Sequence, residues 1–223
     1  MKKRENKILI LDCGSQYTQL IARRVRELGV FSEILFWDSP QEKIEESSPS
    51  GIIISGGPRS VLQSDAPNIP MHILDSDIPL LGICYGMQLI AHQFGGKVKK
   101  GEAAEYGRAS VTLSEGARIF GRVKGEKEIM VWMSHWDQVT ELPPGFNATA
   151  RSDNGSLAAF ESADGRVSAL QFHPEVVHTP RGSDILSAFI FDICACTPDW
   201  NLGMDWIGRE VEKIREKVGS GRV

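Results

Sequence analysis

Short apolar runs alternate with helical patterns along the first hundred residues of the chain. The runs "KILILD" (7–12), "GIIIS" (51–55) and "IPLLGI" (78–83) are apolar on both faces, as buried strands are. Between the first two lies 15–29, which has the apolar spacing of one helix face and stops at Gly29. Buried strands separated by helices predict a parallel sheet that is covered on both sides.

The pattern changes after residue 97. Strand-like segments now follow one another directly, with turn signals such as "DNGS" and "ADGR" between them. They lie at 108–113, 129–133, 157–162 and 166–172. This order predicts antiparallel or mixed pairing, added to the same sheet. The predicted fold class is therefore α/β, with an open, twisted, mostly parallel sheet, helices on both faces and an antiparallel extension.

A helix is predicted after the last strand. Thr179 and Pro180 have the form of an N-cap followed by a first-turn proline, so the helix is expected to open there and to include 181–196. Cys194 and Cys196 would then be small apolar residues on its face. A C-x-C pair without a second pair of ligands nearby is a poor zinc site, so no metal site is predicted.

The last segment carries a second helical pattern. Its apolar positions form a narrow stripe on a charged helix, namely Ile207, Val211, Ile214 and Val218. A helix of this kind usually packs against something else. The predicted organisation is one domain over 1–197 and a connecting helix over 198–223.

The composition narrows the class of protein. Of the 223 residues, 41% are hydrophobic and 24% are charged, with a net charge of −4, which argues against disorder and against a basic nucleic-acid surface. No apolar run reaches membrane-spanning length, and the first run stops at Asp12, too early for a signal peptide. Four cysteines give no disulfide framework in a chain of this size. We expect a soluble, reduced, cytoplasmic protein that binds neither nucleic acid nor membrane.

The first candidate for chemistry is Cys84 in "GICYG" (82–86). This is the form of a nucleophile elbow, in which a strand turns sharply into a helix and the nucleophile occupies the apex. Gly82 and Gly86 would let neighbouring backbone approach without Cβ clashes, and the helix N-terminus would favour the thiolate. The alternative is that Cys84 only fills the core, as most free cysteines do. The motif needs a base.

The candidate base lies in "LQFHPEVVHT" (170–179). His173 and Glu175 are two residues apart, so in an extended segment both side chains point to one face, and Pro174 biases His173 toward that conformation. A carboxylate beside an imidazole can hold its tautomer and stabilise the imidazolium. Taken alone, the segment favours the alternative, a surface turn that has no role.

The third candidate is the glycine pair in "ISGGPRS" (54–60), directly after a predicted strand. Backbone N–H groups at such a strand end can form an oxyanion hole, and Gly57 with Tyr85 would be the pair of donors. The alternative is an ordinary strand–loop turn.

Together these segments resemble the class I (triad) glutamine amidotransferases, and more narrowly the amidotransferase domain of GMP synthetases. The resemblance covers essentially the whole chain in the family's order. Its motifs are "ILILDCGSQYTQLIARRVRELGV", "GIIISGGPRSV", "LGICYGMQLIAHQFGG", "EYG", "VWMSHWDQV" and "QFHPEVVHTPRG". The fold that the resemblance implies is flavodoxin-like.

The resemblance assigns a role to each candidate residue. It implies that Cys84 is the nucleophile, His173 the base and Glu175 the group that orients it. It also implies a glutamine-binding site, with Gln88 in contact with the substrate and the backbone of Ser134, His135 and Trp136 holding the α-amino and α-carboxylate groups.

Two positions depart from the family pattern. Phenylalanine is usual where this chain has Cys13, which we interpret as core variation. Glycine is common where this chain has Trp136, and a tryptophan there would cost strain if the backbone required a positive φ.

The resemblance further implies a reaction shared between two parts of an enzyme. This chain would hydrolyse glutamine through a cysteine thioester to glutamate and ammonia, with no cofactor of its own. An ATP pyrophosphatase (synthetase) domain or subunit would use ATP and Mg²⁺ to aminate XMP to GMP in purine biosynthesis, and the full enzyme would be a homodimer. The "EYG" segment (105–107) and the final helix are the expected contacts with that part, and the connecting helix favours a truncated longer chain over a separate subunit.

Two other classes of protein stay open from the residues alone. One is a stand-alone cysteine hydrolase of the γ-glutamyl peptidase type, which has similar parts. The other is a non-catalytic module that binds glutamine or a partner, although the intact set of Cys84, His173 and Glu175 weighs against it. A dinucleotide-binding protein is disfavoured because no G-x-G-x-x-G follows the first strand.

Overall fold

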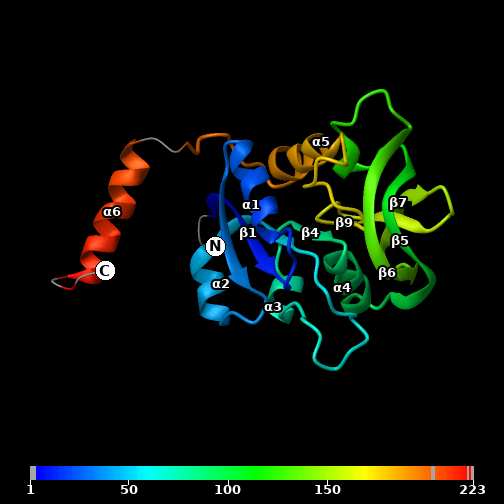
Figure 1. Ribbon diagram of the computed structural model, residues 1–223, viewed down its shortest axis with the longest axis horizontal. Helices are drawn as coiled ribbons and strands as arrows, with labels where there is room; N and C mark the ends of the chain where they lie inside the picture. Colours follow the sequence, from blue (N-terminus) through cyan, green and yellow to red (C-terminus); the bar gives the residue numbers. More distant parts are fainter. Residues whose placement is uncertain (1–3, 202–203, 220, 222–223) are drawn as a thin grey trace.

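One mixed sheet organises the molecule (Figure 1). The computed structural model describes residues 4–201, 204–219 and 221. Nine strands pair in the order β2-β1-β3-β4-β9-β8-β7-β5-β6. In chain order they are β1 (Glu5–Asp12), β2 (Phe31–Phe36), β3 (Pro49–Ile54), β4 (Leu80–Ile83), β5 (Lys97–Leu113), β6 (Glu128–Glu141), β7 (Phe146–Ser152), β8 (Leu157–Ser162) and β9 (Val167–Leu170).

The sheet has two halves of opposite character. Strands β2, β1, β3, β4 and β9 pair in parallel, whereas β8, β7, β5 and β6 continue the sheet in antiparallel pairs. The predicted fold class, a parallel α/β sheet with an antiparallel extension, is therefore confirmed. Two neighbouring parallel strands need a crossover connection, and helices supply most of the crossovers here.

Helices cover both faces of the parallel half, as predicted. The helices are α1 (Thr18–Glu27), α2 (Gln41–Ser47), α3 (Met71–Leu74), α4 (Tyr85–Gln93), α5 (Gly182–Ser187), the π-helix η2 (Ala188–Ile193), the short 3₁₀ helix η1 (Arg118–Phe120) and α6 (Met204–Val218). Side chains of α1, α5 and η2 pack on one face of the sheet, and side chains of α2, α3 and α4 pack on the other.

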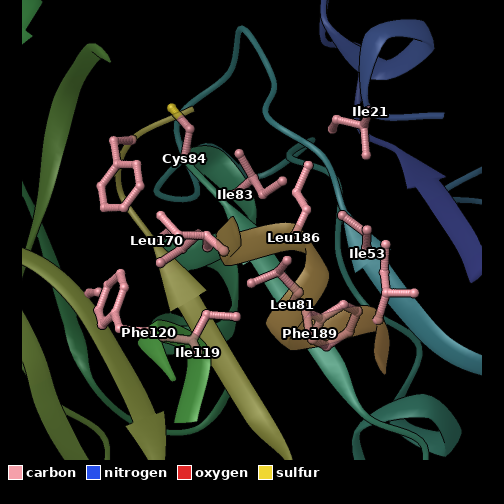
Figure 2. Close-up of a cluster of buried hydrophobic side chains, with 14 of the residues drawn as sticks. Ile21, Ile53, Leu81, Ile83, Cys84, Ile119, Phe120, Leu170, Leu186 and Phe189 are labelled. Carbon is pink, nitrogen blue, oxygen red and sulfur yellow. The ribbon is translucent and has the colours of Figure 1, made fainter. Parts of the chain in front are cut away.

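Strand alternation explains these two buried layers. Along β3, Ile53 points into the first layer while Ile52 and Ile54 point into the second. Figure 2 shows the first layer, where Leu81 packs near Phe189 and Cys84 lies at the rim with its sulfur directed away from the other side chains. The candidate nucleophile Cys84 therefore lies at the edge of the apolar core.

Parallel pairing gathers the candidate residues at one edge of the sheet. Strand β3 ends just before Gly56 and Gly57, β4 ends just before Cys84, and β9 ends shortly before His173. Because these strands are parallel neighbours, their carboxyl ends lie together, and ligands of open α/β sheets bind at that edge.

The antiparallel half returns to the same edge. Strand β6 is the outer strand of the extension, four places from β9 in the sheet. Even so, the His173 N–H donates a hydrogen bond to the Trp132 carbonyl of β6, at 3.1 Å. The extension therefore curls until its edge strand faces the ends of the parallel strands, which places β6 beside Cys84.

Some predicted boundaries are wrong. The helix expected to open at Thr179 begins at Gly182, and its helical part ends at Ile193, so Cys194 and Cys196 follow it as buried core residues. Strand β5 is longer than the predicted 108–113, because residues from Lys97 onward already pair with β6. Strands β2 and β7 were not predicted.

The chain after η2 first packs along the edge of the parallel half. The Asn6 side chain hydrogen-bonds Thr197 and Asp199, and the Trp200 N–H donates to the Gly29 carbonyl at 2.8 Å. Helix α6 follows, and it lies apart from the sheet (Figure 1). On it, Val211 and Ile214 are exposed, whereas the side chain of Ile207 lies outside the described residues.

Among the described residues, no helix combines the length and the apolar character that crossing a membrane requires.

Candidate active site

Cys84 adopts the conformation predicted for a nucleophile elbow. It has φ of 53° and ψ of −104° at the junction of β4 and α4, a region that residues with side chains rarely adopt. A Cβ on Gly82 would lie 2.5 Å from the Gly86 carbonyl oxygen, and one on Gly86 would lie 2.3 Å from that of Ile54. Both glycines are therefore required by close packing of backbone, which confirms the role predicted for these two glycines.

His173 and Glu175 form the predicted pair. The His173 Nδ1 and the Glu175 Oε1 are 2.7 Å apart, and both side chains are buried. Burial alone would lower the pKa of His173, but hydrogen bonds to Cys84 and Glu175, together with their negative charge, raise it to about 10. The imidazole thus touches the candidate nucleophile on one side and a carboxylate on the other, which favours the imidazolium.

This raised pKa predicts a pH dependence of stability that Glu175→Gln should weaken. A raised pKa means that the folded protein binds the His173 proton more tightly than the unfolded chain. The stabilisation is fully present below about pH 6.5, the ordinary pKa of histidine, and is lost as the pH rises toward about 10. Because the amide removes one cause of the shift, the free energy of unfolding should fall less over this range in Glu175→Gln.

Urea unfolding at a series of pH values measures this difference. Glu42→Gln, which changes an exposed carboxylate of α2, is the matched control and should keep the wild-type slope. Identical slopes in the wild type and Glu175→Gln would contradict the assignment.

The glycine loop lies against the elbow. A Cβ on Gly57 would be 2.7 Å from the Cys13 carbonyl oxygen and 3.3 Å from the Tyr85 Cγ, so only glycine fits between α4 and the residue that follows β1. Gly57, Tyr85 and Cys84 line one cavity of about 290 Å³. The two residues expected to supply oxyanion N–H groups are thus neighbours of the nucleophile.

The predicted glutamine-binding residues line the same cavity. These are Gln88, Ser134, His135 and Trp136. The Cys84 Sγ is 3.5 Å from the Ser134 carbonyl oxygen, which accepts from the thiol. The Gln88 Nε2 donates to the Asp137 carbonyl oxygen at 2.8 Å, so its amide holds β6 against α4.

The two unusual residues fit without strain. Among the residues that the structure describes, only Ser48, Cys84 and Ala195 combine a side chain with a positive φ, so the backbone at Trp136 accepts tryptophan. The Trp136 ring is half exposed at the cavity, with the Lys100 Nζ 5.5 Å from its centroid. Cys13 is buried in the core, as interpreted from the sequence.

Sequence reasoning missed two residues that contact the candidate triad. The Gln171 Nε2 lies 3.9 Å from the Cys84 Sγ, and the ring of Tyr17 meets that of His173 edge-on with centroids 5.1 Å apart. Gln171 continues the two-residue spacing of His173 and Glu175, so the same argument could have found it. Tyr17 follows β1, a distant segment, and no local pattern indicated its contact.

A larger cavity, of about 400 Å³, lies at the opposite edge of the sheet. It is lined by residues of α2 and α3 and by residues at the amino ends of the parallel strands, including Arg4 and Asp77, which form an ion pair. Its lining contains no cysteine, and the Nε2 of its one histidine, His72, has no hydrogen-bond partner in the described part of the chain. The smaller cavity, which Cys84 lines, is therefore the candidate active site.

A nucleophile elbow, a buried histidine–glutamate pair and this α/β sheet are the parts that a cysteine hydrolase with a catalytic triad requires. The profile of the family described as "Glutamine amidotransferase class-I" matches residues 9–193. The chain belongs to the class I glutamine amidotransferase family.

Relatives place the chain more narrowly. It is 47% identical to a GMP synthase (glutamine-hydrolysing) of Aquifex aeolicus, over 97% of this chain and 42% of the relative. It is 48% identical to a protein of the same name from Coxiella burnetii, over 98% of this chain and 43% of the relative. The chain thus spans less than half the length of these curated relatives. The narrower resemblance, to the amidotransferase part of GMP synthetases, is confirmed.

Solved structures agree. A protein from Thermoplasma acidophilum, provisionally assigned as one of the subunits of a GMP synthase, matches with a TM-score of 0.72 and 35% identity, over 93% of this chain and 97% of that one. A glutamine amidotransferase from Thermotoga maritima matches with a TM-score of 0.62 and 20% identity, over 96% of this chain and 94% of that one. The second likeness supports the fold alone.

Proposed function

We propose that this chain is a glutaminase in which Cys84, His173 and Glu175 are the catalytic triad. The proposal rests on the observation that these three side chains contact one another. The strained elbow presents the Cys84 thiol to the His173 imidazole, and Glu175 contacts the Nδ1 atom of the same imidazole. The class of reaction is acyl transfer from a carboxamide, which needs a nucleophile, a proton donor for the leaving amine and an oxyanion site.

In the first half-reaction, the Cys84 thiolate attacks the side-chain amide carbon of glutamine. A carbon–sulfur bond forms, and the negative charge moves to the amide oxygen, where the N–H groups of Gly57 and Tyr85 stabilise it. The tetrahedral species then expels its nitrogen, which takes a proton from the His173 imidazolium and leaves as ammonia. The product is a γ-glutamyl thioester on Cys84.

In the second half-reaction, the now neutral His173 removes a proton from water. The resulting hydroxide attacks the thioester carbonyl, and the carbon–sulfur bond breaks to release glutamate and regenerate the thiolate. Glu175 stays ionised throughout and holds His173 in orientation. Gln88 and the backbone of Ser134, His135 and Trp136 are proposed to hold the α-amino and α-carboxylate groups of the substrate, because all four residues line the cavity.

The acceptor of the ammonia is proposed from the relatives. Because they are GMP synthases and this chain spans less than half their length, we infer that a synthetase part aminates XMP to GMP with ATP and Mg²⁺. Tyr106 is largely exposed and Trp136 half exposed beside the cavity, and we propose this face and helix α6 as the contacts with that part. A homodimeric full enzyme in the cytoplasm belongs to the same proposal.

The experiment that tests the proposal is an assay of glutamate release from glutamine. The chain is measured alone and then with the synthetase part, XMP, ATP and Mg²⁺. We expect weak hydrolysis alone and a strong rise when the other part is present, because uncoupled hydrolysis wastes glutamine. Equal rates would contradict activation by the partner. Hydrolysis of γ-glutamyl dipeptides in preference to glutamine would replace this function by the peptidase alternative.

A further inference from the structure

Thr179 has a different role from the helix cap that its sequence predicts. The helix begins at Gly182, three residues later, and the side chain of Thr179 is only 3% exposed. Its hydroxyl is therefore available for other contacts, and it makes two with backbone near the triad.

The Thr179 hydroxyl bonds two backbone segments at once. It donates to the His173 carbonyl oxygen at 2.7 Å and accepts from the Trp132 N–H at 3.1 Å. The His173 N–H in turn donates to the Trp132 carbonyl oxygen at 3.1 Å. We call this closed set of three hydrogen bonds the Thr179 bridge. His173 and Trp132 contribute only backbone groups to it. The Thr179 hydroxyl is the only side-chain group in the bridge, so it alone can be removed by a substitution.

The Thr179 bridge joins the two sides of the cavity. His173 carries the imidazole, whereas Trp132 lies on β6, two residues before Ser134, whose carbonyl oxygen faces the Cys84 thiol. Fixing the backbone of His173 to that of Trp132 therefore fixes the imidazole relative to the strand that lines the substrate cavity. The imidazole makes its own contacts to Glu175 and Cys84 only while its backbone stays in place.

The hydroxyl is held in place by a tight turn. The Thr179 N–H donates to the Val176 carbonyl oxygen at 3.1 Å, and the Gly182 N–H donates to the Thr179 carbonyl oxygen at 2.9 Å. A Cβ on Gly182 would lie 1.9 Å from the Pro174 carbonyl oxygen, so this turn packs directly on the segment between His173 and Glu175. The turn thus has little freedom to place the hydroxyl elsewhere.

We propose that Thr179 is a positioning residue of the catalytic triad, acting through the backbone of His173. The inference rests on the proposed glutaminase function. The Thr179 bridge needs a hydroxyl that donates one hydrogen bond and accepts another, and both serine and threonine supply such a group. Valine has the same shape as threonine and can do neither.

Thr179→Val and Thr179→Ser test the proposal. Because a misplacement of about 1 Å at a reacting group can cost ~10²-fold, we expect kcat for glutamine to fall by about that factor in Thr179→Val. KM should change little, since His173 acts on the reaction and not on the binding of glutamine. Thr179→Ser should keep most of the wild-type kcat.

The second readout is independent of turnover. In protein labelled with ¹⁵N-histidine, NMR follows the titration of the His173 imidazole, whose raised pKa of about 10 depends on its contacts with Cys84 and Glu175. We expect a lower pKa in Thr179→Val and a wild-type value in Thr179→Ser. Thr149→Val is the matched control, because the Thr149 hydroxyl is also buried and has no hydrogen-bond partner in the described part of the chain.

The outcomes separate this inference from the proposed function. If the wild type hydrolyses glutamine and Thr179→Val matches it in kcat and in His173 titration, the Thr179 bridge has no positioning role. If the wild type is inactive even with the synthetase part, the proposed function fails. The His173 titration then still shows whether the Thr179 bridge positions the imidazole. Should Thr179→Val not fold, Thr179→Ala carries the same expectation. Loss of stability alone, with unchanged kcat and titration, would overturn the proposal.

Discussion

Alanine in place of Cys84 is expected to abolish glutamate release, with a loss on the order of 10⁴-fold or more. The thiolate forms the covalent bond to the substrate, and no other described cysteine lines the cavity. Losing one member of a triad leaves only the acceleration that binding and the oxyanion site provide. The measurement is the rate of glutamate release by the chain with the synthetase part, XMP, ATP and Mg²⁺, for the wild type and Cys84→Ala.

Cys196→Ala is the matched control for this experiment. Cys196 is also a buried free cysteine, but it follows η2 and lies outside the cavity. It should retain the wild-type rate. A diazoketone analogue of glutamine should label the wild type at Cys84 in a 1:1 ratio, and glutamine should protect against it. Glutamate release by Cys84→Ala above a hundredth of the wild-type rate would show that Cys84 is not the nucleophile.

Alanine in place of Gly86 is expected to lower the free energy of unfolding by about 3 kcal/mol or more. The added Cβ would lie 2.3 Å from the Ile54 carbonyl oxygen, which belongs to the neighbouring strand and cannot rotate away as a side chain could. Overpacking in a close-packed interior costs ~1–3 kcal/mol, and a clash with backbone is at the upper end. Glutamate release should fall as well, because the shift moves the elbow that carries Cys84.

Gly208→Ala is the control for Gly86→Ala. Gly208 lies within α6, and nothing lies within 4 Å of a Cβ added there. Alanine favours a helix over glycine by ~0.5–1 kcal/mol, so the helix content measured by circular dichroism should rise or stay unchanged. Urea unfolding of both variants gives the comparison. If Gly86→Ala unfolds at the wild-type urea concentration, the close approach of α4 to β3 is not as described.

Most of the candidate reacting groups of this site could be predicted from short stretches of sequence. The elbow could be predicted because a buried strand, two glycines and a helix stand in direct succession around Cys84. The His173–Glu175 pair was predicted from a spacing of two residues in an extended segment; the two side chains do meet, but Pro174 and Glu175 lie in a turn and not in an extended strand. In both cases the residues of the motif are close together in sequence, so their order and spacing could indicate the motif, whereas the packing of Gly86 on Ile54 could not be predicted in this way.

Contacts between distant segments could not be predicted from the residues. Thr179 has the sequence form of a cap, but tertiary hydrogen bonds to Trp132 and His173 outweighed that local preference. The hydrogen bond from the Gln88 amide to the Asp137 carbonyl at the cavity wall was not predicted either. The backbone at Trp136 follows its extended strand, which the family pattern of glycine did not indicate.

Because the sheet curls and brings β6 back to the parallel half, the reacting groups and the residues that shape the substrate cavity come from different parts of the sheet. Cys84, His173 and Glu175 follow strands of the parallel half, whereas Ser134 and Trp136 belong to the edge strand of the antiparallel half. Substitutions of the cavity-lining residues of β5 and β6 can therefore reshape what the cavity accepts without altering the reacting groups. Under selection, or in a mutant library, new acyl specificities should arise from this edge of the sheet while the chemistry is inherited unchanged.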